Sequence, residues 1–262
     1  MAEQPIRFED GAAYEPMMGK WSQLVGATFL DWLAPQPGLR WLDVGCGNGA
    51  FSEMVVERCA PAALQGIDPS EGQLAFARTR PAARVAHFRQ GDAMAPPFPD
   101  DSFDLAVMAL VIFFVPEPVK GVNEMVRVVC PGGTVAAYAW DMLGGGFPLD
   151  AMQVEMRSLG VTPSMPPSAG ASRMDAMHDL WNGAGLDAVE TRDVTVQRTF
   201  ANFDDFWTTS LTGTSVGRKV RAMAPSDVQT LQERLRARLP ADAQGHITCS
   251  ARANAVRGRV RK

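Results

Sequence analysis

The sequence contains few cysteines and histidines, and it lacks an apolar run long enough to cross a membrane. Four cysteines lie scattered among 262 residues, with no CxxC pair and no histidine at ligand spacing. This excludes a disulfide framework and argues against a zinc site, so we expect reduced thiols and a cytoplasmic protein. The longest apolar run, 105–115, ends at Pro116, well short of the about 20 residues that a spanning helix needs. The first ten residues, MAEQPIRFED, predict no secretory signal.

The charge is small overall but unevenly distributed. The formal net charge is −4, whereas residues 214–262 contain eleven Lys or Arg and only three Asp or Glu. A basic segment can bind nucleic acid or an acidic surface, but it is more often a solvated face. We therefore expect a small-molecule partner, no nucleic acid and no membrane span. The oligomeric state and the role of the basic segment stay open.

Short apolar segments alternate with helical ones through the first half of the chain. Strands are expected at 40–45, 63–67, 84–89, 103–109 and 133–140, and helices at 17–33, 49–59, 70–78 and 117–129. This alternation predicts βαβ crossovers and a mostly parallel sheet with helices on both faces. The remaining segments are expected as a partly irregular insertion at 142–172, helices at 173–184 and 202–240, and strands at 187–199 and 246–256.

The strongest chemical signal is the segment LDVGCGNGAF, residues 42–51. Asp43 precedes three glycines, at 45, 47 and 49, between an expected strand and an expected helix. Glycines allow a tight turn and let a ligand approach the main chain, while the helix start favours an anionic group. The same letters also fit the GxGxxG/A pattern of dinucleotide sites, so the loop alone leaves the cofactor open.

Two further carboxylates follow the next expected strands, and the second of them narrows the choice of cofactor. Asp68 ends the second strand, where it can accept hydrogen bonds from both hydroxyls of a ribose, which fits NAD equally well. Asp92, with the backbone N–H of Ala93, can bind the amine and ring nitrogen of adenine at the end of the third strand. A nicotinamide fingerprint calls for neither this acid nor Asp43. These positions therefore favour an adenosine-type cofactor over NAD.

Four motifs in this order resemble the class I S-adenosylmethionine-dependent methyltransferases. They are the DxGxGxG segment, Asp68, GDA followed by PFPDDSFD at 97–104, and VVCPGG at 128–133. The resemblance covers about residues 12–140 and is closest to the bacterial small-molecule branch similar to the ubiquinone/menaquinone-biosynthesis C-methyltransferases. It implies a Rossmann-like α/β sheet of seven strands in the order 3-2-1-4-5-7-6, with strand 7 antiparallel. It also implies S-adenosylmethionine as the cofactor and S-adenosylhomocysteine as the product.

The resemblance also suggests how the chain is divided. A single methyltransferase domain is expected over residues 1–262. Its core would comprise about 34–141, 173–200 and 241–257, and helical lid segments about 1–33, 142–172 and 201–240.

The resemblance assigns cofactor contacts residue by residue. The expected contacts are Tyr14, Trp21, Asp43, Gly45, Cys46, Gly47, Asn48, Gly49, Asp68, Pro69, Ser70, Asp92, Ala93, Ala109 and Leu110. The first two would cover the cofactor, and the three glycines would line its methionine moiety. Asp68 would hold the ribose with Pro69 and Ser70 beside the adenine, and backbone carbonyls at the end of the fourth strand, 109–110, would meet the methionyl amino group.

The sequence assigns no catalytic residue. It has no His–Asp or Cys–His constellation, and the segment 111–114 is apolar where related proteins often carry polar groups. Asp141 and His178 are kept as candidates for an acid or base near the acceptor. No metal is expected, because Ala109 and Leu110 stand where a metal-assisted site would want an acid. An aromatic set could form either an acceptor pocket or ordinary packing: Trp21, Phe113, Phe114, Trp140, Trp181 and Trp207.

The sequence therefore predicts an enzyme that transfers a methyl group to O, C or N of a small, fairly apolar acceptor. In-line displacement would be promoted mainly by proximity and by desolvation. Two alternatives stay open. The protein could bind S-adenosylmethionine or S-adenosylhomocysteine without transferase activity, or it could be an NAD-dependent oxidoreductase, although no Tyr-x-x-x-Lys constellation is evident.

Overall fold

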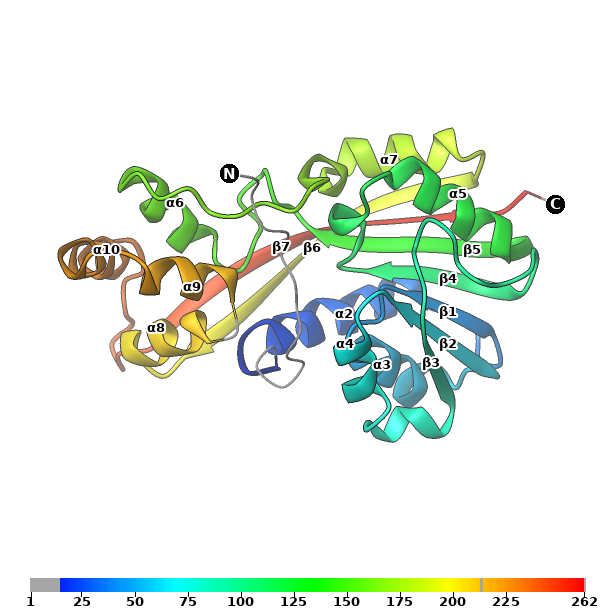
Figure 1. The fold of residues 1–262 in the computed structure, drawn as a ribbon, viewed down its shortest axis with the longest axis horizontal. Coiled ribbons are helices and arrows are strands. Elements are labelled where there is room, and N and C mark those ends of the chain that lie inside the picture. The colour runs from blue at the N-terminus through cyan, green and yellow to red at the C-terminus, as the bar shows by residue number, and fades with distance from the viewer. Residues whose placement is uncertain (1–14, 213, 262) are drawn as a thin grey trace.

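A twisted seven-stranded sheet forms the centre of the computed structural model, which describes residues 15–212 and 214–261 (Figure 1). The strands are β1 (Arg40–Val44), β2 (Ala63–Asp68), β3 (Ala86–Gln90), β4 (Phe103–Ala109), β5 (Val129–Trp140), β6 (Asp187–Phe200) and β7 (Ile247–Arg259). Their order is β3-β2-β1-β4-β5-β7-β6, and β7 runs antiparallel to both of its neighbours. The Rossmann-like fold and the strand order expected from the sequence are confirmed.

Helices cover both faces of the sheet. One face carries α2 (Lys20–Leu33), α3 (Ala50–Cys59) and α4 (Glu71–Ala77), and the other carries α5 (Pro118–Val128) and α7 (Met174–Gly183) (Figure 1). Helix α5 shows why these segments form amphipathic helices. Its residues Gly121, Val122, Met125 and Val128 are buried at spacings of three and four, so a single stripe of the helix faces the sheet.

Strands β6 and β7 extend beyond the end of β5 and carry a helical cap. The last pair between β5 and β7 joins Trp140 to Ala253, whereas β6 and β7 pair as far as Phe200 and Ile247. Between these two strands in sequence lie α8 (Phe203–Leu211), α9 (Ser215–Arg221) and α10 (Pro225–Arg238). Helix α6 (Asp150–Ser158) packs beside α10, so the cap gathers at one end of the sheet (Figure 1).

One strand boundary differs from the expectation. Strand β5 begins at Val129 instead of 133, because a register shift along β4 accommodates the extra residues. Helix α6 is the regular part of the insertion expected at 142–172. Helix α2, expected within a lid segment, packs beside the sheet, and its Phe29 ring lies 4.6 Å from the Tyr138 ring of β5.

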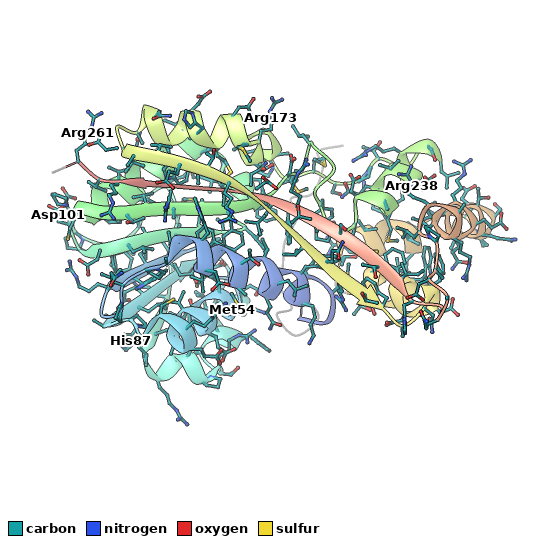
Figure 2. The ribbon with its side chains drawn as sticks, turned by 180° about the vertical axis from the view of Figure 1, so that it is seen from behind. Met54, His87, Asp101, Arg173, Arg238 and Arg261 are labelled. Atoms are coloured by element: carbon teal, nitrogen blue, oxygen red, sulfur yellow. The ribbon has the colours of Figure 1, made fainter. Side chains whose placement is uncertain are left out.

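Several of the basic residues near the end of the chain are paired with carboxylates. Arg234 and Arg238 of α10 both approach Glu155 of α6, at 4.0 and 2.8 Å. Arg261 pairs with Asp187 of β6 at 3.0 Å. Figure 2 shows Arg238 and Arg261 at opposite ends of the molecule. The positive charge is therefore distributed along the fold and takes part in its internal contacts.

Three simpler properties concern membranes, cysteines and metals. Within residues 15–212 and 214–261, no helix combines the length and the hydrophobicity that crossing a bilayer requires. All four cysteines are free thiols. The same residues contain no group of three His, Cys, Asp or Glu side chains placed to hold a metal ion.

Candidate functional site

The glycine loop between β1 and α3 depends on glycine at the expected positions. Gly45, Gly47 and Gly49 have φ values of +75°, +51° and +79°, in the left-handed region that other residues rarely adopt. A Cβ atom at Gly45 would lie 2.5 Å from the Val111 side chain, and one at Gly49 would lie 3.0 Å from Ala77. The space above Gly47 is open, with Gln73 Oε1 the nearest atom at 3.9 Å. The loop is therefore packed at its two ends and accessible in its middle.

Asp68, at the end of β2, is held by the backbone of this loop. Its Oδ2 accepts a hydrogen bond from Gly47 N–H at 2.9 Å, and its Oδ1 accepts one from Ser70 N–H at 2.9 Å. Burial raises the pKa of the carboxyl, and these two donors oppose the increase. Each carboxylate oxygen can accept more than one hydrogen bond, so capacity remains for a ligand.

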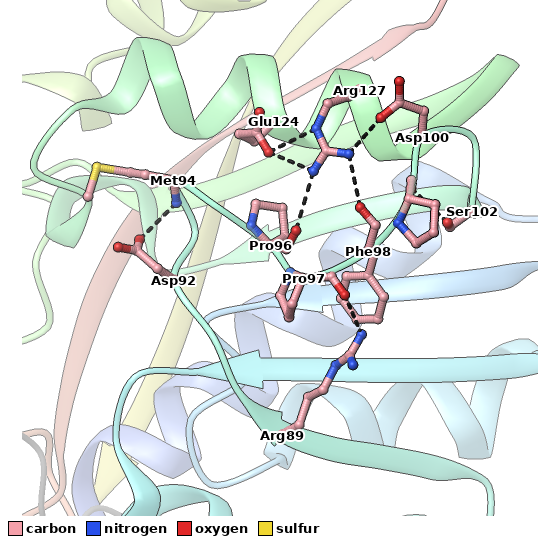
Figure 3. Close-up of polar contacts among 11 residues, drawn as sticks. Arg89, Asp92, Met94, Pro96, Pro97, Phe98, Asp100, Ser102, Glu124 and Arg127 are labelled. Carbon is pink, nitrogen blue, oxygen red and sulfur yellow. Dashed lines mark hydrogen bonds and ion pairs between the residues drawn. The ribbon is translucent and has the colours of Figure 1, made fainter.

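The loop after β3 is held by two arginines (Figure 3). Asp92 Oδ1 accepts a hydrogen bond from Met94 N–H at 2.8 Å. Arg127 of α5 donates to the Phe98 carbonyl at 2.9 Å and pairs with Asp100 and Glu124, each at 2.7 Å. On the other side, the guanidinium of Arg89 lies 3.9 Å from the centre of the Phe98 ring and donates to the Pro97 carbonyl. These contacts fix the path of the chain just after Asp92.

Asp43, in β1, is a buried carboxyl with one unpaired oxygen. Ser52 Oγ donates to its Oδ2 at 2.6 Å, while Oδ1 has no hydrogen-bond partner within the described residues. The side chain is 1% exposed, and this burial raises its pKa to about 7. A buried carboxyl with a vacant acceptor can be stabilised as the anion by a cation bound beside it.

These groups open into one cavity of about 850 Å³. Of the residues expected to contact a cofactor, twelve line it: Asp43, Gly45, Cys46, Gly47, Asn48, Asp68, Pro69, Ser70, Asp92, Ala93, Ala109 and Leu110. Leu110, just after β4, has a left-handed φ of +62° and donates its N–H to the Tyr138 carbonyl at 2.8 Å. A strained non-glycine residue at the edge of a cavity is common at functional sites.

Residues 42–137 match the family described as a methyltransferase domain. The chain is 34% identical over 150 residues to a ubiquinone/menaquinone biosynthesis C-methyltransferase of Roseobacter denitrificans, covering 55% of this chain and 58% of that protein. It is 37% identical over 107 residues to a demethylmenaquinone methyltransferase of Desulfitobacterium hafniense, covering 39% and 42%. The family match thus extends from β1 into β5, and the named relatives share this part of the chain. It spans about half the length of the curated relatives it matches.

Two solved structures share the fold over most of the chain. The YcgJ protein of Bacillus subtilis aligns with a TM-score of 0.61 at 17% identity, covering 91% of this chain and 98% of that one. Phosphoethanolamine N-methyltransferase 2 of Haemonchus contortus, solved with S-adenosyl-L-methionine, aligns with a TM-score of 0.58 at 17% identity, covering 95% and 56%. At such identities the likeness concerns the fold.

Three other residues expected to contact a cofactor are not among the described residues that line the cavity. Tyr14 lies outside the described residues. Trp21 is fully buried in α2, whereas its neighbours Ser22 and Gln23 do line the cavity. Gly49 supports the loop from behind, against Ala77 of α4.

Asp141 and His178, the candidate acid or base residues, lie in a different depression. This depression is lined by residues of α7, β6 and β7, and neither residue reaches the large cavity. Asp141 Oδ2 pairs with Arg252 of β7 at 2.6 Å, and its Oδ1 accepts from Gly144 N–H at 2.9 Å. Its polar atoms are thus engaged in holding the turn after β5, and the structure gives neither residue a position from which it could act on a molecule in the cavity.

The aromatic set divides between the cavity and ordinary packing. Phe113, Phe114 and Trp140 line the cavity, whereas Trp181 donates its Nε1–H to the Val135 carbonyl at 2.9 Å in the core. Trp207 stacks on a phenylalanine within the cap.

Sequence reasoning missed Gln73, which lines the cavity beside Gly47. The signal was present, because Ser70-Glu71-Gly72-Gln73 has the S-x-x-Q pattern of a capping box, and Ser70 Oγ accepts from Gln73 N–H at 3.4 Å.

Proposed function

We propose that the protein is an S-adenosylmethionine-dependent methyltransferase that acts on a small, largely apolar acceptor. One observation carries the proposal: Asp43, Asp68 and Asp92, from three neighbouring strands or the loops after them, line one cavity around a glycine loop. In this proposal Asp68 holds the ribose hydroxyls and Asp92 the adenine edge. The carbonyls of Ala109 and Leu110 meet the methionyl amino group.

Two features of the site fit such a cofactor. The vacant Oδ1 of Asp43 would place negative charge near the positively charged methionine moiety. The open space above Gly47 would let that moiety lie against the main chain, where any other residue would add a side chain to an already left-handed backbone.

The chemistry that this site requires is mainly positional. S-adenosylmethionine supplies a methyl group on a positively charged sulfur. The chain has to hold the acceptor in line with that methyl group and to keep water away, and such positioning can contribute about 7–11 kcal/mol to lowering a barrier. Phe113, Phe114 and Trp140 form the apolar wall that would do both.

The cavity offers no separate base. Among the described residues that line it, the only Asp, Glu, His, Lys or Arg side chains are Asp43, Asp68 and Asp92, all at the proposed cofactor end. An acceptor that loses its proton readily, such as a phenol or an enolisable ring carbon, suits this arrangement. The methylated atom, O, C or N, stays open in the proposal.

The cap supplies the other end of the cavity. Phe147, Leu149 and Pro166 from the segment after β5, and Thr214 and Val216 near α9, line it. We include in the proposal a single domain in which segments of about 1–33, 142–172 and 201–240 form a lid over a core of about 34–141, 173–200 and 241–257. A lid excludes water from a displacement. The cytoplasmic location expected from the scattered cysteines also belongs to the proposal.

Calorimetric titration of the protein with S-adenosylmethionine, S-adenosylhomocysteine and NAD, side by side, tests the cofactor. Binding of both sulfur compounds without NAD supports the proposal. Binding of NAD alone would return the glycine loop to a dinucleotide-binding role and refute the proposal.

Transfer is tested separately, by formation of S-adenosylhomocysteine in the presence of an acceptor panel that includes demethylmenaquinone analogues, after the name of one relative. Cofactor binding without turnover across phenols, enolisable ring carbons and amines would favour the binding protein without transferase activity.

A further inference from the structure

The lid segments line the cavity with apolar side chains, with Ser164, Thr214 and Ser215, and with one buried amide. Phe147 and Leu149 precede α6, and Gln153 projects from the first part of that helix; all three line the cavity. Gln153 is only 3% exposed. A buried amide is costly unless its polar atoms are hydrogen-bonded, so the partners of this side chain are informative.

Only one half of the Gln153 amide is paired. Arg157, one turn later in α6, donates from Nη2 to Gln153 Oε1 at 3.2 Å. Because a guanidinium can only donate, this contact assigns the oxygen to the side facing Arg157 and leaves Nε2 as the free donor. Within the described residues Nε2 has no hydrogen-bond partner.

Another unpaired donor belongs to a lining residue. Trp140 lines the cavity, and its buried Nε1 has no partner within the described residues. At Asp43, beside the glycine loop, the vacant atom is instead a carboxyl oxygen. The lining residues therefore include an unpaired acceptor at the glycine loop and an unpaired amide donor on α6.

We propose that Gln153 Nε2 donates a hydrogen bond to an oxygen of the methyl acceptor. The acceptor class is then a compact aromatic ring compound with a carbonyl or hydroxyl oxygen, held between Phe113, Trp140 and Phe147. This rests on the proposed function, because the other end of the cavity must belong to the cofactor. Arg157 acts as a positioning residue that sets the orientation of the amide.

Two bicyclic probes of nearly the same shape test this assignment. 1-Tetralone carries a carbonyl oxygen, whereas tetralin carries hydrogen atoms at that position, and neither reacts with thiols. Their dissociation constants are measured by calorimetry with S-adenosylhomocysteine present, for the wild-type protein and for Gln153→Leu. A matched control is Met152→Leu, at the neighbouring buried position of α6, which does not line the cavity.

The expected result is a change in discrimination between the probes. Gln153→Leu should weaken 1-tetralone about five- to tenfold, as expected for one lost hydrogen bond, and should leave tetralin bound as well or better. Met152→Leu should alter both constants equally. Gln153→Glu keeps the shape of the side chain and its contact with Arg157 but removes the donor, so it should behave as Gln153→Leu does toward 1-tetralone.

Two outcomes overturn the assignment. An unchanged ratio of the two dissociation constants in Gln153→Leu would show that the amide only packs. No binding of 1-tetralone to the wild type would show that the amide recognises no such oxygen. Affinity for S-adenosylhomocysteine is measured in each variant. If the wild type itself fails to bind S-adenosylhomocysteine, the proposed function fails, which this readout distinguishes from failure of the Gln153 assignment.

Discussion

Replacing Asp43 by Asn should remove a pH-dependent part of the free energy of unfolding. The folded carboxyl is buried, and its pKa rises to about 7 from an ordinary value of 3.8, mainly because burial disfavours the charged form. Between these two pH values the unfolded chain is ionised at this position and the folded chain is protonated. Folding therefore takes up a proton, and the stability of the wild type decreases as pH rises through this window.

The size of the effect follows from the two pKa values. They differ by about 3, and each pH unit is worth about 1.4 kcal/mol, so the full contribution is about 4 kcal/mol. It is complete below about pH 4 and is lost by the time the pH exceeds about 7. Between pH 5 and pH 7 we expect the wild type to lose about 2 kcal/mol relative to Asp43→Asn.

Urea unfolding followed by circular dichroism at pH 5, 6, 7 and 8 measures this difference. Subtracting the variant from the wild type cancels the other titrating groups, which both proteins share. Asp193→Asn, which removes an exposed carboxyl on β6, is the control and should show a nearly constant difference. If the stability difference between the wild type and Asp43→Asn is the same at every pH, the carboxyl does not titrate as its burial requires, and the argument fails.

Three further predictions concern the cavity. Asp68→Asn should weaken S-adenosylhomocysteine binding about tenfold or more in calorimetry, because charge-assisted hydrogen bonds to the ribose are lost; unchanged affinity in a folded variant would contradict the proposed cofactor geometry. Gly45→Ala should destabilise the fold by about 2–4 kcal/mol in urea unfolding, since its Cβ would meet Val111 at 2.5 Å, whereas Gly38→Ala, with φ of +79° and open space, should cost about 1 kcal/mol; equal losses would refute the steric argument. Asp141→Ala should leave S-adenosylhomocysteine affinity and methyl transfer nearly unchanged, because the carboxylate lies outside the cavity; a tenfold loss of either would place it in the site.

The gathering of Asp43, Asp68 and Asp92 around the glycine loop could be predicted from the sequence because its determinants are local. Each expected carboxylate lies at or near the end of a short apolar segment, and parallel strands bring their carboxyl ends to one edge of a sheet. The left-handed turns at Gly45 and Gly47 likewise follow from residues adjacent in the chain. No long-range information was needed to place these residues together.

The surroundings of Asp141 could not be predicted from the local sequence in the same way. The residue follows β5 directly, so by the same logic it was expected to face the acceptor. The antiparallel strand β7 brings Arg252 within 2.6 Å of its carboxylate and draws that side chain into a turn. Arg252 lies 111 residues after Asp141, so the sequence around Asp141 does not indicate this contact. Arg127 was missed for the same reason, since its contacts with the loop after Asp92 join distant segments.

Two arginines near the end of the chain also make contacts between segments that are distant in sequence. Glu155 of α6 is contacted by both Arg234 and Arg238 of α10, and its side chain is only 12% exposed. It lies two residues from Gln153, on the helix that supplies the lid end of the cavity. Helix α10 does not line the cavity within the described residues, yet its arginines hold the helix that does. Strand ends therefore fix the glycine-loop end of the cavity, whereas ion pairs between helices distant in sequence join the helix at its other end to α10.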